Sequence, residues 1–587
     1  MPALSDRRGL AFTEILAAEL APREGRWTAV MRIAAASAIT VAIAMTFRIP
    51  DVPYMAYIVF LISRDDRNGT IRAALGGFAA ITIAVLVTLA LAVVDTAEPV
   101  LRLPAMAITT FVAMYTTRTF ALGPLTFLAG FVIVLLHSVI DDVPSTEAFT
   151  RATLWVWVIV GVPVAVTVTM HGLFGHGGEV TARRAVRHIL EELTAALDRG
   201  DVHRWLPQWR RTLVPLNGEA VSLLLEALTI LEMIPEPRRA GSPLRGPASA
   251  AELAFDACLT RLHDVLSRPE EATPAPAPEK NAERKLFAAD AFTNPAHWQF
   301  ALKTTAAVMT CYAIYTLLDW PGLRTAIVTC FFVSLGSLGE TVHKLLLRIS
   351  GAVVGGVLAG LCIVFVLPGF TDIGQLCLLI ALVSLAAAWI ATSNEIIAYA
   401  GMQIAFAFFL GILQGYAPAT DLTVLRDRIF GILLGNIVVT LVFSSLWPES
   451  ARAAARNAVA EVMRALGTVL KGGSQNARTR AVQALASAER FRALSSLEMR
   501  MLATTRSGST SMLDLTELER LAGATFVATA GAETDNTTLI RLGDWMETAA
   551  DRVTQRHTLP EVPAIAPARP AVEQLKSEIA HVASASV

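Results

Sequence analysis

The sequence predicts an all-α membrane protein with two parallel repeats of about six transmembrane helices, each repeat followed by an α-helical cytoplasmic domain. Three observations carry this prediction. The 587 residues are 54% hydrophobic and 17% charged, which is too apolar for a soluble protein and too charged for one that lies wholly within a bilayer. Uncharged stretches long enough to cross about 30 Å of hydrocarbon recur along the chain. The pattern that opens the membrane part occurs twice, in the same direction.

The repeat is visible in three pairs of residues, each 271 positions apart: Trp27 and Trp298, Arg32 and Lys303, Pro50 and Pro321. After each opening, two short uncharged stretches are followed by a long one. A parallel duplication of membrane spans indicates transport rather than catalysis at a surface.

We expect six spans in each half, at about 27–47, 50–63, 72–94, 103–117, 120–140 and 152–174, and then at 298–318, 322–338, 346–367, 373–393, 397–416 and 429–447. Between and after them, apolar residues at three- and four-residue spacing predict amphipathic helices. The expected domains are a cytoplasmic N-terminal segment (1–26), a first transmembrane repeat (27–175), a helical cytoplasmic domain with a Pro-rich linker (176–290), a second transmembrane repeat (297–447) and a second helical cytoplasmic domain with a Pro-rich tail (448–587).

The distribution of charge predicts that both termini are cytoplasmic. With the N-terminus inside, the inner loops of the first half hold Arg64, Arg67, Arg72 and Arg118, whereas its outer loops are mainly acidic. This agrees with the excess of basic residues that cytoplasmic loops carry. The second half is ambiguous by the same criterion, because several of its arginines fall at outer helix ends.

Several function classes are excluded or disfavoured. A net charge of −1 without a basic aromatic patch argues against nucleic acid as a partner. The five cysteines form no C-x-x-C pair, so the sequence predicts neither a metal site nor a disulfide framework. No G-x-x-x-x-G-K-[ST] loop, H-E-x-x-H or G-x-S-x-G pattern is present. We therefore expect no enzymatic activity and no cofactor, and uphill transport must draw on an ion gradient or a partner subunit.

Two long helices open with an arginine followed by a stripe of small residues. Arg348 precedes one pair of glycines and Arg428 the other, and in both cases the first glycine comes three positions later. The paired glycines are Gly351 with Gly355 and Gly431 with Gly435. A residue shares one helix face with the residues three and seven positions after it. Each arginine is therefore expected to face the helix packed against the glycines rather than lipid.

Cationic side chains at membrane helix ends suggest a path for organic anions, because the guanidinium fork matches the two oxygens of a carboxylate. The candidate substrate-binding residues are Arg32, Lys303, Arg151, Arg428 and Arg348. The alternative for each is snorkelling to the interface or pairing with a nearby acid. The candidates for proton coupling are His137, Asp141 and Glu340.

The second half resembles the fusaric acid resistance, or aromatic acid exporter, family of bacterial inner-membrane proteins. The resemblance lies in the segments 339–356 and 427–436, in Leu446-Trp-Pro448, and in the twofold layout of membrane part and cytoplasmic part. The segment 63–70 of the first half departs from the family pattern. The resemblance implies proton-driven export of small aromatic or other organic acids across the inner membrane, alongside a periplasmic adaptor of the membrane-fusion type.

Three alternatives remain open. Plant aluminium-activated malate channels look like distant relatives, which keeps a passive organic-anion channel in view. The run Asp66-Arg-Asn-Gly69 is similar to an inner-loop motif of major-facilitator transporters, whose halves are also parallel repeats. The third alternative is a membrane scaffold without transport activity that regulates the envelope. We also expect a homo-oligomer, specifically a dimer, with contacts through the cytoplasmic helices.

Overall fold

The computed structural model describes residues 25–97, 99–214, 218–234, 249–268, 286–288, 290–333, 338–393, 395–416, 421–447, 451–473, 475–501, 515–530, 536–555, 557–563 and 570–585, with the single positions 20, 22 and 216. Within these ranges the regular structure is helical, apart from one antiparallel bridge between Phe120 and Phe287. The chain divides into two compact units. We call Ala17–Gly177 with Glu279–Glu449 the membrane unit, and Met1–Leu16 with Gly178–Pro278 and Ser450–Val587 the helical unit.

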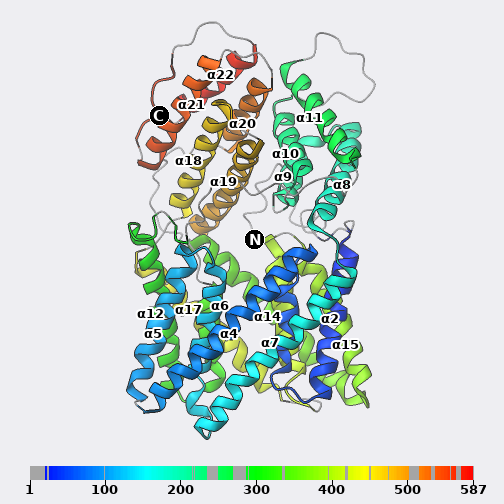
Figure 1. Cartoon of the computed structure of the whole chain (residues 1–587), viewed down its shortest axis with the longest axis vertical. Helices are drawn as coiled ribbons and strands as arrows, with labels where there is room; N and C mark the ends of the chain where they lie inside the picture. Colours follow the sequence, from blue (N-terminus) through cyan, green and yellow to red (C-terminus); the bar gives the residue numbers. More distant parts are fainter. Residues whose placement is uncertain are drawn as a thin grey trace. The chain divides into compact units, whose positions relative to one another are not determined.

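The α-helices of the membrane unit are drawn in Figure 1. In the first half they are α2 (Arg26–Thr46), α3 (Val52–Ile62), α4 (Arg67–Ala97), α5 (Arg102–Thr119), α6 (Gly123–His137) and α7 (Thr146–Phe174). In the second half they are α12 (Pro295–Leu317), α13 (Thr325–Val333), α14 (Leu338–Phe365), α15 (Ile373–Ala391), α16 (Glu395–Ile412) and α17 (Thr423–Ser445).

Among the described residues, seven helical segments that contain all or most of α2, α4, α6, α7, α14, α15 and α17 are long and apolar enough to cross a bilayer. Three further apolar helices are shorter: Val52–Ile62, Pro321–Val333 and Ile397–Ile412. At 1.5 Å per residue, the 11 residues of α3 extend about 17 Å, roughly half the thickness of the hydrocarbon core. The molecule is therefore a membrane protein whose apolar helices include several that are too short to cross unaided.

The first helices of the two halves end in the same unusual way. Arg48 after α2 and Asp319 after α12 have positive φ angles of 51° and 49°, a region that non-glycine residues rarely adopt. In both cases the next amide closes the helix, with Ile49 N donating to Ala44 O and Trp320 N donating to Tyr315 O. This pattern satisfies carbonyls at the helix end and turns the chain sharply into the next helix.

The helix pairs that cross between the halves are reciprocal. α2 packs against α15, and α5 packs against α12; α3 packs against α16, and α6 packs against α13. Each half therefore contributes the same kind of element to the other, and the membrane unit is one body assembled from both halves.

Close helix contacts occur at the glycines that the sequence singled out. A Cβ added at Gly351 of α14 would lie 2.7 Å from the Ala400 carbonyl oxygen of α16. A Cβ added at Gly435 of α17 would lie 2.7 Å from Cβ of Thr329 on α13. Any larger residue would force these helices apart, so the glycines bring α14 and α17 to the helices they pack on.

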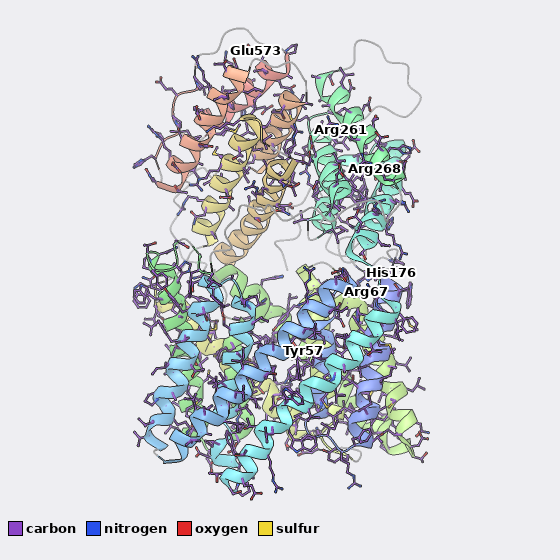
Figure 2. The ribbon with its side chains drawn as sticks, viewed as in Figure 1. Tyr57, Arg67, His176, Arg261, Arg268 and Glu573 are labelled. Carbon is purple, nitrogen blue, oxygen red and sulfur yellow. The ribbon has the colours of Figure 1, made fainter. Side chains whose placement is uncertain are left out.

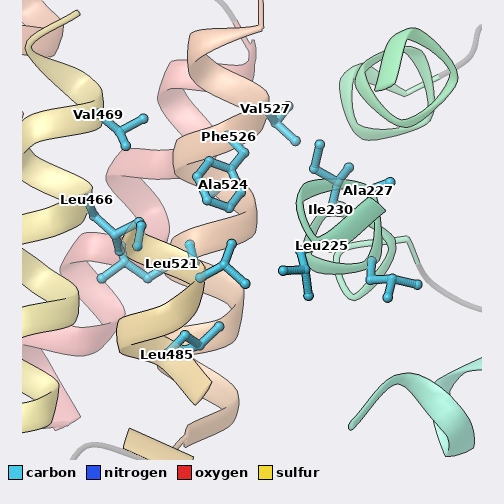
Figure 3. Packing of buried hydrophobic residues seen from close by; sticks show 14 of the residues in the cluster. Leu225, Ala227, Ile230, Leu466, Val469, Leu485, Leu521, Ala524, Phe526 and Val527 are labelled. Carbon is cyan, nitrogen blue, oxygen red and sulfur yellow. The ribbon is translucent and has the colours of Figure 1, made fainter. Parts of the chain in front are cut away.

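The helical unit consists of α8 (Gly178–Arg199), α9 (Val202–Leu213), α10 (Glu219–Leu231), α11 (Ala250–Ser267), α18 (Ala451–Leu470), α19 (Gln475–Met501), α20 (Leu515–Thr529), α21 (Asn536–Gln555) and α22 (Pro570–Ala585). A single hydrophobic core draws on both sequence segments. Figure 3 shows Leu225, Ala227 and Ile230 of α10 in this core with Leu521 and Phe526 of α20. The two segments of this unit thus share one core and stabilise each other.

Buried ion pairs join the same two segments. Arg210 of α9 donates to Glu519 of α20 at 3.0 Å and lies 3.5 Å from Glu232, and all three side chains are at most 7% exposed. Arg478 of α19 pairs with the buried Glu226 of α10. Because each partner is desolvated, losing one leaves an uncompensated charge in the core.

We expect Arg210→Met to destabilise the helical unit by about 3–5 kcal/mol, because Glu519 and Glu232 would then face each other without a cation. The measurement is the melting temperature of the purified full-length protein in detergent. Arg464→Gln is the control, since Arg464 pairs with Asp551 on the surface, where such a pair contributes about 1 kcal/mol or less. Equal melting temperatures for the two variants would contradict the role given to Arg210.

Cys258 of α11 provides a test that depends on pH. Burial, with a further contribution from the neighbouring Glu226, raises the pKa of its thiol to about 12. Only the thiolate reacts with alkylating reagents, so at pH 9 about one thiol in a thousand is reactive. In a variant that retains Cys258 as its sole cysteine, we expect slow alkylation from pH 7 to pH 9 and rapid alkylation after denaturation. Comparable rates before and after denaturation would contradict the buried placement.

Candidate functional site

The structure brings two of the five predicted cationic candidates together inside the membrane unit. Arg348 on α14 is 1% exposed and Arg428 on α17 is 6% exposed. Their guanidinium groups are close enough to repel each other electrostatically. α16 contacts both α14 and α17, so the two arginines meet beside a common neighbour.

Aromatic side chains surround the two guanidinium groups. Arg348 Nη1 donates to the Tyr399 hydroxyl at 3.0 Å. The Arg428 guanidinium lies over the Phe406 ring, 4.0 Å from its centroid, in a cation–π contact. Tyr57 of α3 stacks on the same Phe406, with centroids 4.0 Å apart and ring planes inclined by 17°. We call Arg348, Arg428, Tyr54, Tyr57, Tyr399, Gln403 and Phe406 the anion cluster.

Several buried polar atoms of the anion cluster have no hydrogen-bond partner among the described residues. Nε and Nη2 of both Arg348 and Arg428 are buried and donate to no acceptor among the described residues. The Gln403 amide lies beside the Tyr57 hydroxyl without a well-formed hydrogen bond. Tyr54 of α3 lies near Arg428 and edge-on to Phe406.

Within the part of the chain that the structure describes, no carboxylate forms an ion pair with Arg348 or Arg428. A buried charge is costly by several kcal/mol unless it is paired, and the cost rises inside a membrane. Two adjacent buried cations with four unsatisfied donor nitrogens therefore form a site that an anion would stabilise.

The site lies near the middle of the membrane unit. Figure 2 shows Tyr57 about halfway along this unit, whereas Arg67 and His176 lie at one end of it. Tyr57 belongs to α3 and Tyr399 to α16, and both helices contain short apolar segments. The second helix of each half, α3 and α13, is short, and short helices in corresponding places of two halves are a structural indicator of transporter binding sites.

Arg32 and Lys303 lie elsewhere, in equivalent surroundings. Arg32 Nη1 donates to the carbonyl of Phe174 at 3.1 Å, at the end of α7. Lys303 Nζ donates to the carbonyl of Trp447 at 3.0 Å, just after α17. Each cation therefore satisfies a carbonyl at the C-terminus of the last helix of its own half, where positive charge also complements the helix dipole.

The remaining candidates are not part of the anion cluster. Arg151 is exposed and pairs with Glu147 at 2.6 Å, one helical turn earlier. His137 is buried, and its Nδ1 lies 2.7 Å from the Ile133 carbonyl. Asp141 pairs with Arg102 at 2.6 Å. The side chain of Glu340 lies outside the described residues.

The sequence analysis did not select the uncharged members of the anion cluster. Tyr399, Gln403 and Phe406 follow one another at four- and three-residue spacing, which places them on one face of α16. Tyr54 and Tyr57 are likewise three residues apart on α3. Tyrosine and glutamine side chains on one face of an uncharged span could have indicated a polar site from the sequence. Their meeting across the two halves was not predictable from spacing.

Comparison with known families identifies the second half. Residues 310–442 match the fusaric acid resistance protein-like family. This part of the chain is similar to fusaric acid resistance proteins, and the chain is a membrane protein. Five members of the anion cluster lie within the matched range, whereas Tyr54 and Tyr57 lie outside it. The five are Arg348, Tyr399, Gln403, Phe406 and Arg428.

Curated relatives are similar over different lengths. Multidrug resistance protein MdtO of an Escherichia coli O6:H1 strain is 27% identical over 486 residues, which cover 73% of this chain and 70% of the relative. The proteins of the same name from Escherichia coli K12 and Shigella flexneri are 36% identical over 203 residues, which cover 34% of this chain and 30% of each relative. No solved structure matches the chain significantly.

The placement of Lys303 generates a stability prediction. We expect Lys303→Met to lower the melting temperature, because a charge-assisted hydrogen bond of about 1.5–3 kcal/mol to the Trp447 carbonyl is lost while methionine preserves the packing. Lys303→Arg is the matched variant and should retain most of the stability. If Lys303→Met melts at the wild-type temperature, the lysine does not hold the end of α17.

Proposed function

We propose that this protein is a transporter of small organic anions, chiefly aromatic carboxylic acids, and that the anion binds between Arg348 and Arg428. The family match and the multidrug resistance relatives support a role in membrane transport. The observation that carries the substrate class is the buried pair of guanidinium groups, whose unsatisfied donors suit a carboxylate. Arg428 and Tyr57 already lie against the Phe406 ring, so a planar ring would pack against the edge of this aromatic pair or against Tyr54.

In this proposal the membrane unit is a pair of parallel repeats of six helices, with the helical unit and both termini in the cytoplasm of a bacterium. The reciprocal contacts of α2 with α15 and of α5 with α12 support the repeat. The basic inner loops of the first half support the orientation. A bilayer crossed by twelve helices then surrounds the anion cluster, and the shorter helices are shielded by longer neighbours.

The proposal includes export across the inner membrane, driven by the proton gradient and continued outward by a periplasmic adaptor. Support for the adaptor comes from the short connections predicted on the outer side, which provide no domain that could reach a second membrane. The protein would act as a transporter and not as an enzyme, and it would work as a homodimer. Measuring the anion flux with and without a pH gradient distinguishes proton-driven transport from passive conduction.

The experiment uses the full-length protein in proteoliposomes and follows efflux of radiolabelled 4-hydroxybenzoate. We expect Arg348→Gln and Arg428→Gln each to reduce the protein-dependent rate at least about tenfold, because loss of a charged hydrogen bond is worth about 1.5–3 kcal/mol. Arg464→Gln, on the surface of the helical unit, serves as the control and should transport at the wild-type rate.

Wild-type rates in both Arg348→Gln and Arg428→Gln would contradict the anion site. Flux that collapses when the pH gradient is removed supports the proton-driven mode. A flux that follows only the anion's electrochemical gradient would instead assign the same site to a channel.

A further inference from the structure

The contact between α6 and α13 is the counterpart of the contact between α3 and α16. α6 and α16 are the fifth helices of their halves, and α13 and α3 are the second. Phe127 and Phe131, four residues apart on α6, take the places of Tyr399 and Gln403, four residues apart on α16. Both phenylalanines face α13, as Tyr399 and Gln403 face Tyr57 on α3.

Four phenylalanines interlock in this counterpart position. Phe127 and Phe131 of α6 each meet Phe331 and Phe332 of α13 edge-on, with centroid distances between 5.1 and 6.2 Å and interplanar angles between 66° and 88°. Edge-to-face packing of this kind is favourable beyond the area that it buries. We call these four residues the phenylalanine cluster.

The counterpart position also lacks the equivalent of Arg348. The 271-residue spacing of the repeat places Gly77 in correspondence with Arg348. Arg151, which stands near the start of α7 as Arg428 does in α17, is exposed and paired with Glu147. Gly77 approaches Leu128, one residue after Phe127, so the matching position holds apolar side chains where the second half holds charge and hydroxyl groups. Apolar rings provide no donor for an anion and no partner for water.

We propose that each chain carries a single anion passage, formed by α3 with α14, α16 and α17, and that the phenylalanine cluster seals the pseudo-equivalent position between α6 and α13. This inference rests on the proposed function, since it assumes that the anion cluster is the passage. A constriction of apolar rings excludes ions by excluding the water that would accompany them. The sealed half would then serve as a scaffold for the half that binds.

The test compares cysteine accessibility at the two equivalent positions. In a background in which Cys258, Cys311, Cys330, Cys362 and Cys377 are replaced by alanine, Phe131→Cys and Gln403→Cys are each introduced into the full-length protein. Labelling with a negatively charged, membrane-impermeant methanethiosulfonate is followed in proteoliposomes. Gln403 is fully buried at rest and Phe131 only partly buried, so labelling of Gln403→Cys requires the passage to open to water during transport. We expect Gln403→Cys to react at least about tenfold faster than Phe131→Cys, since a thiol in water ionises and one in an apolar cluster does not.

The possible outcomes test the seal and the anion site separately. Fast labelling at Gln403→Cys that benzoate slows, with slow labelling at Phe131→Cys, supports a single passage. Comparable fast labelling at both positions overturns the seal while leaving the anion site intact. Slow labelling at both positions overturns the open passage itself, and with it the single-passage proposal. The melting temperatures of both variants verify that each has folded.

Discussion

A guanidinium group held in the interior of a membrane protein needs a counter-charge, and this requirement organises the membrane unit. Arg348 and Arg428 are both buried, lie close enough to repel each other, and leave four donor nitrogens unsatisfied by the protein. Such an arrangement is stable only if the surrounding structure imposes it. The close approach of α14 to α16 at Gly351, and of α17 to α13 at Gly435, supplies that constraint. The packing of the helices therefore holds the two arginines in the arrangement that creates the site.

Other buried cations of the protein have acceptors close to them. Arg32 and Lys303 donate to carbonyls at the ends of α7 and α17, which holds the last helix of each half at its C-terminus. In the helical unit, Arg210 is as deeply buried as the membrane arginines but is paired with the carboxylates of Glu519 and Glu232, and only its Nε is without a hydrogen bond among the described residues. Arg348 and Arg428 differ in that two nitrogens of each are unsatisfied and no carboxylate among the described residues pairs with them.

The sequence predicted much of this from local patterns. Spacing placed Arg348 and Arg428 on the faces that their helices bury, because glycines three and seven positions later mark the packed side. Spacing could not show that Tyr57 would join them, since that depends on a contact between α3 and α16 across about 350 residues. Nor could it assign Arg32 and Lys303, whose partners depend on where α7 and α17 end. The proton-coupling role of His137 and Asp141 remains a prediction; in the structure His137 Nδ1 lies against the Ile133 carbonyl and Asp141 pairs with Arg102.

The most direct test of the account is to locate a bound aromatic anion. Crystals of the full-length protein soaked with 4-iodobenzoate would give an anomalous signal from iodine, and the carboxylate should lie between Arg348 and Arg428 with the ring against Tyr57 or Phe406. The account predicts one such site in each chain, lost in Arg428→Gln. Iodine found only beside Arg32 or Lys303, or unchanged occupancy in Arg428→Gln, would contradict the claim that the buried arginine pair binds the anion.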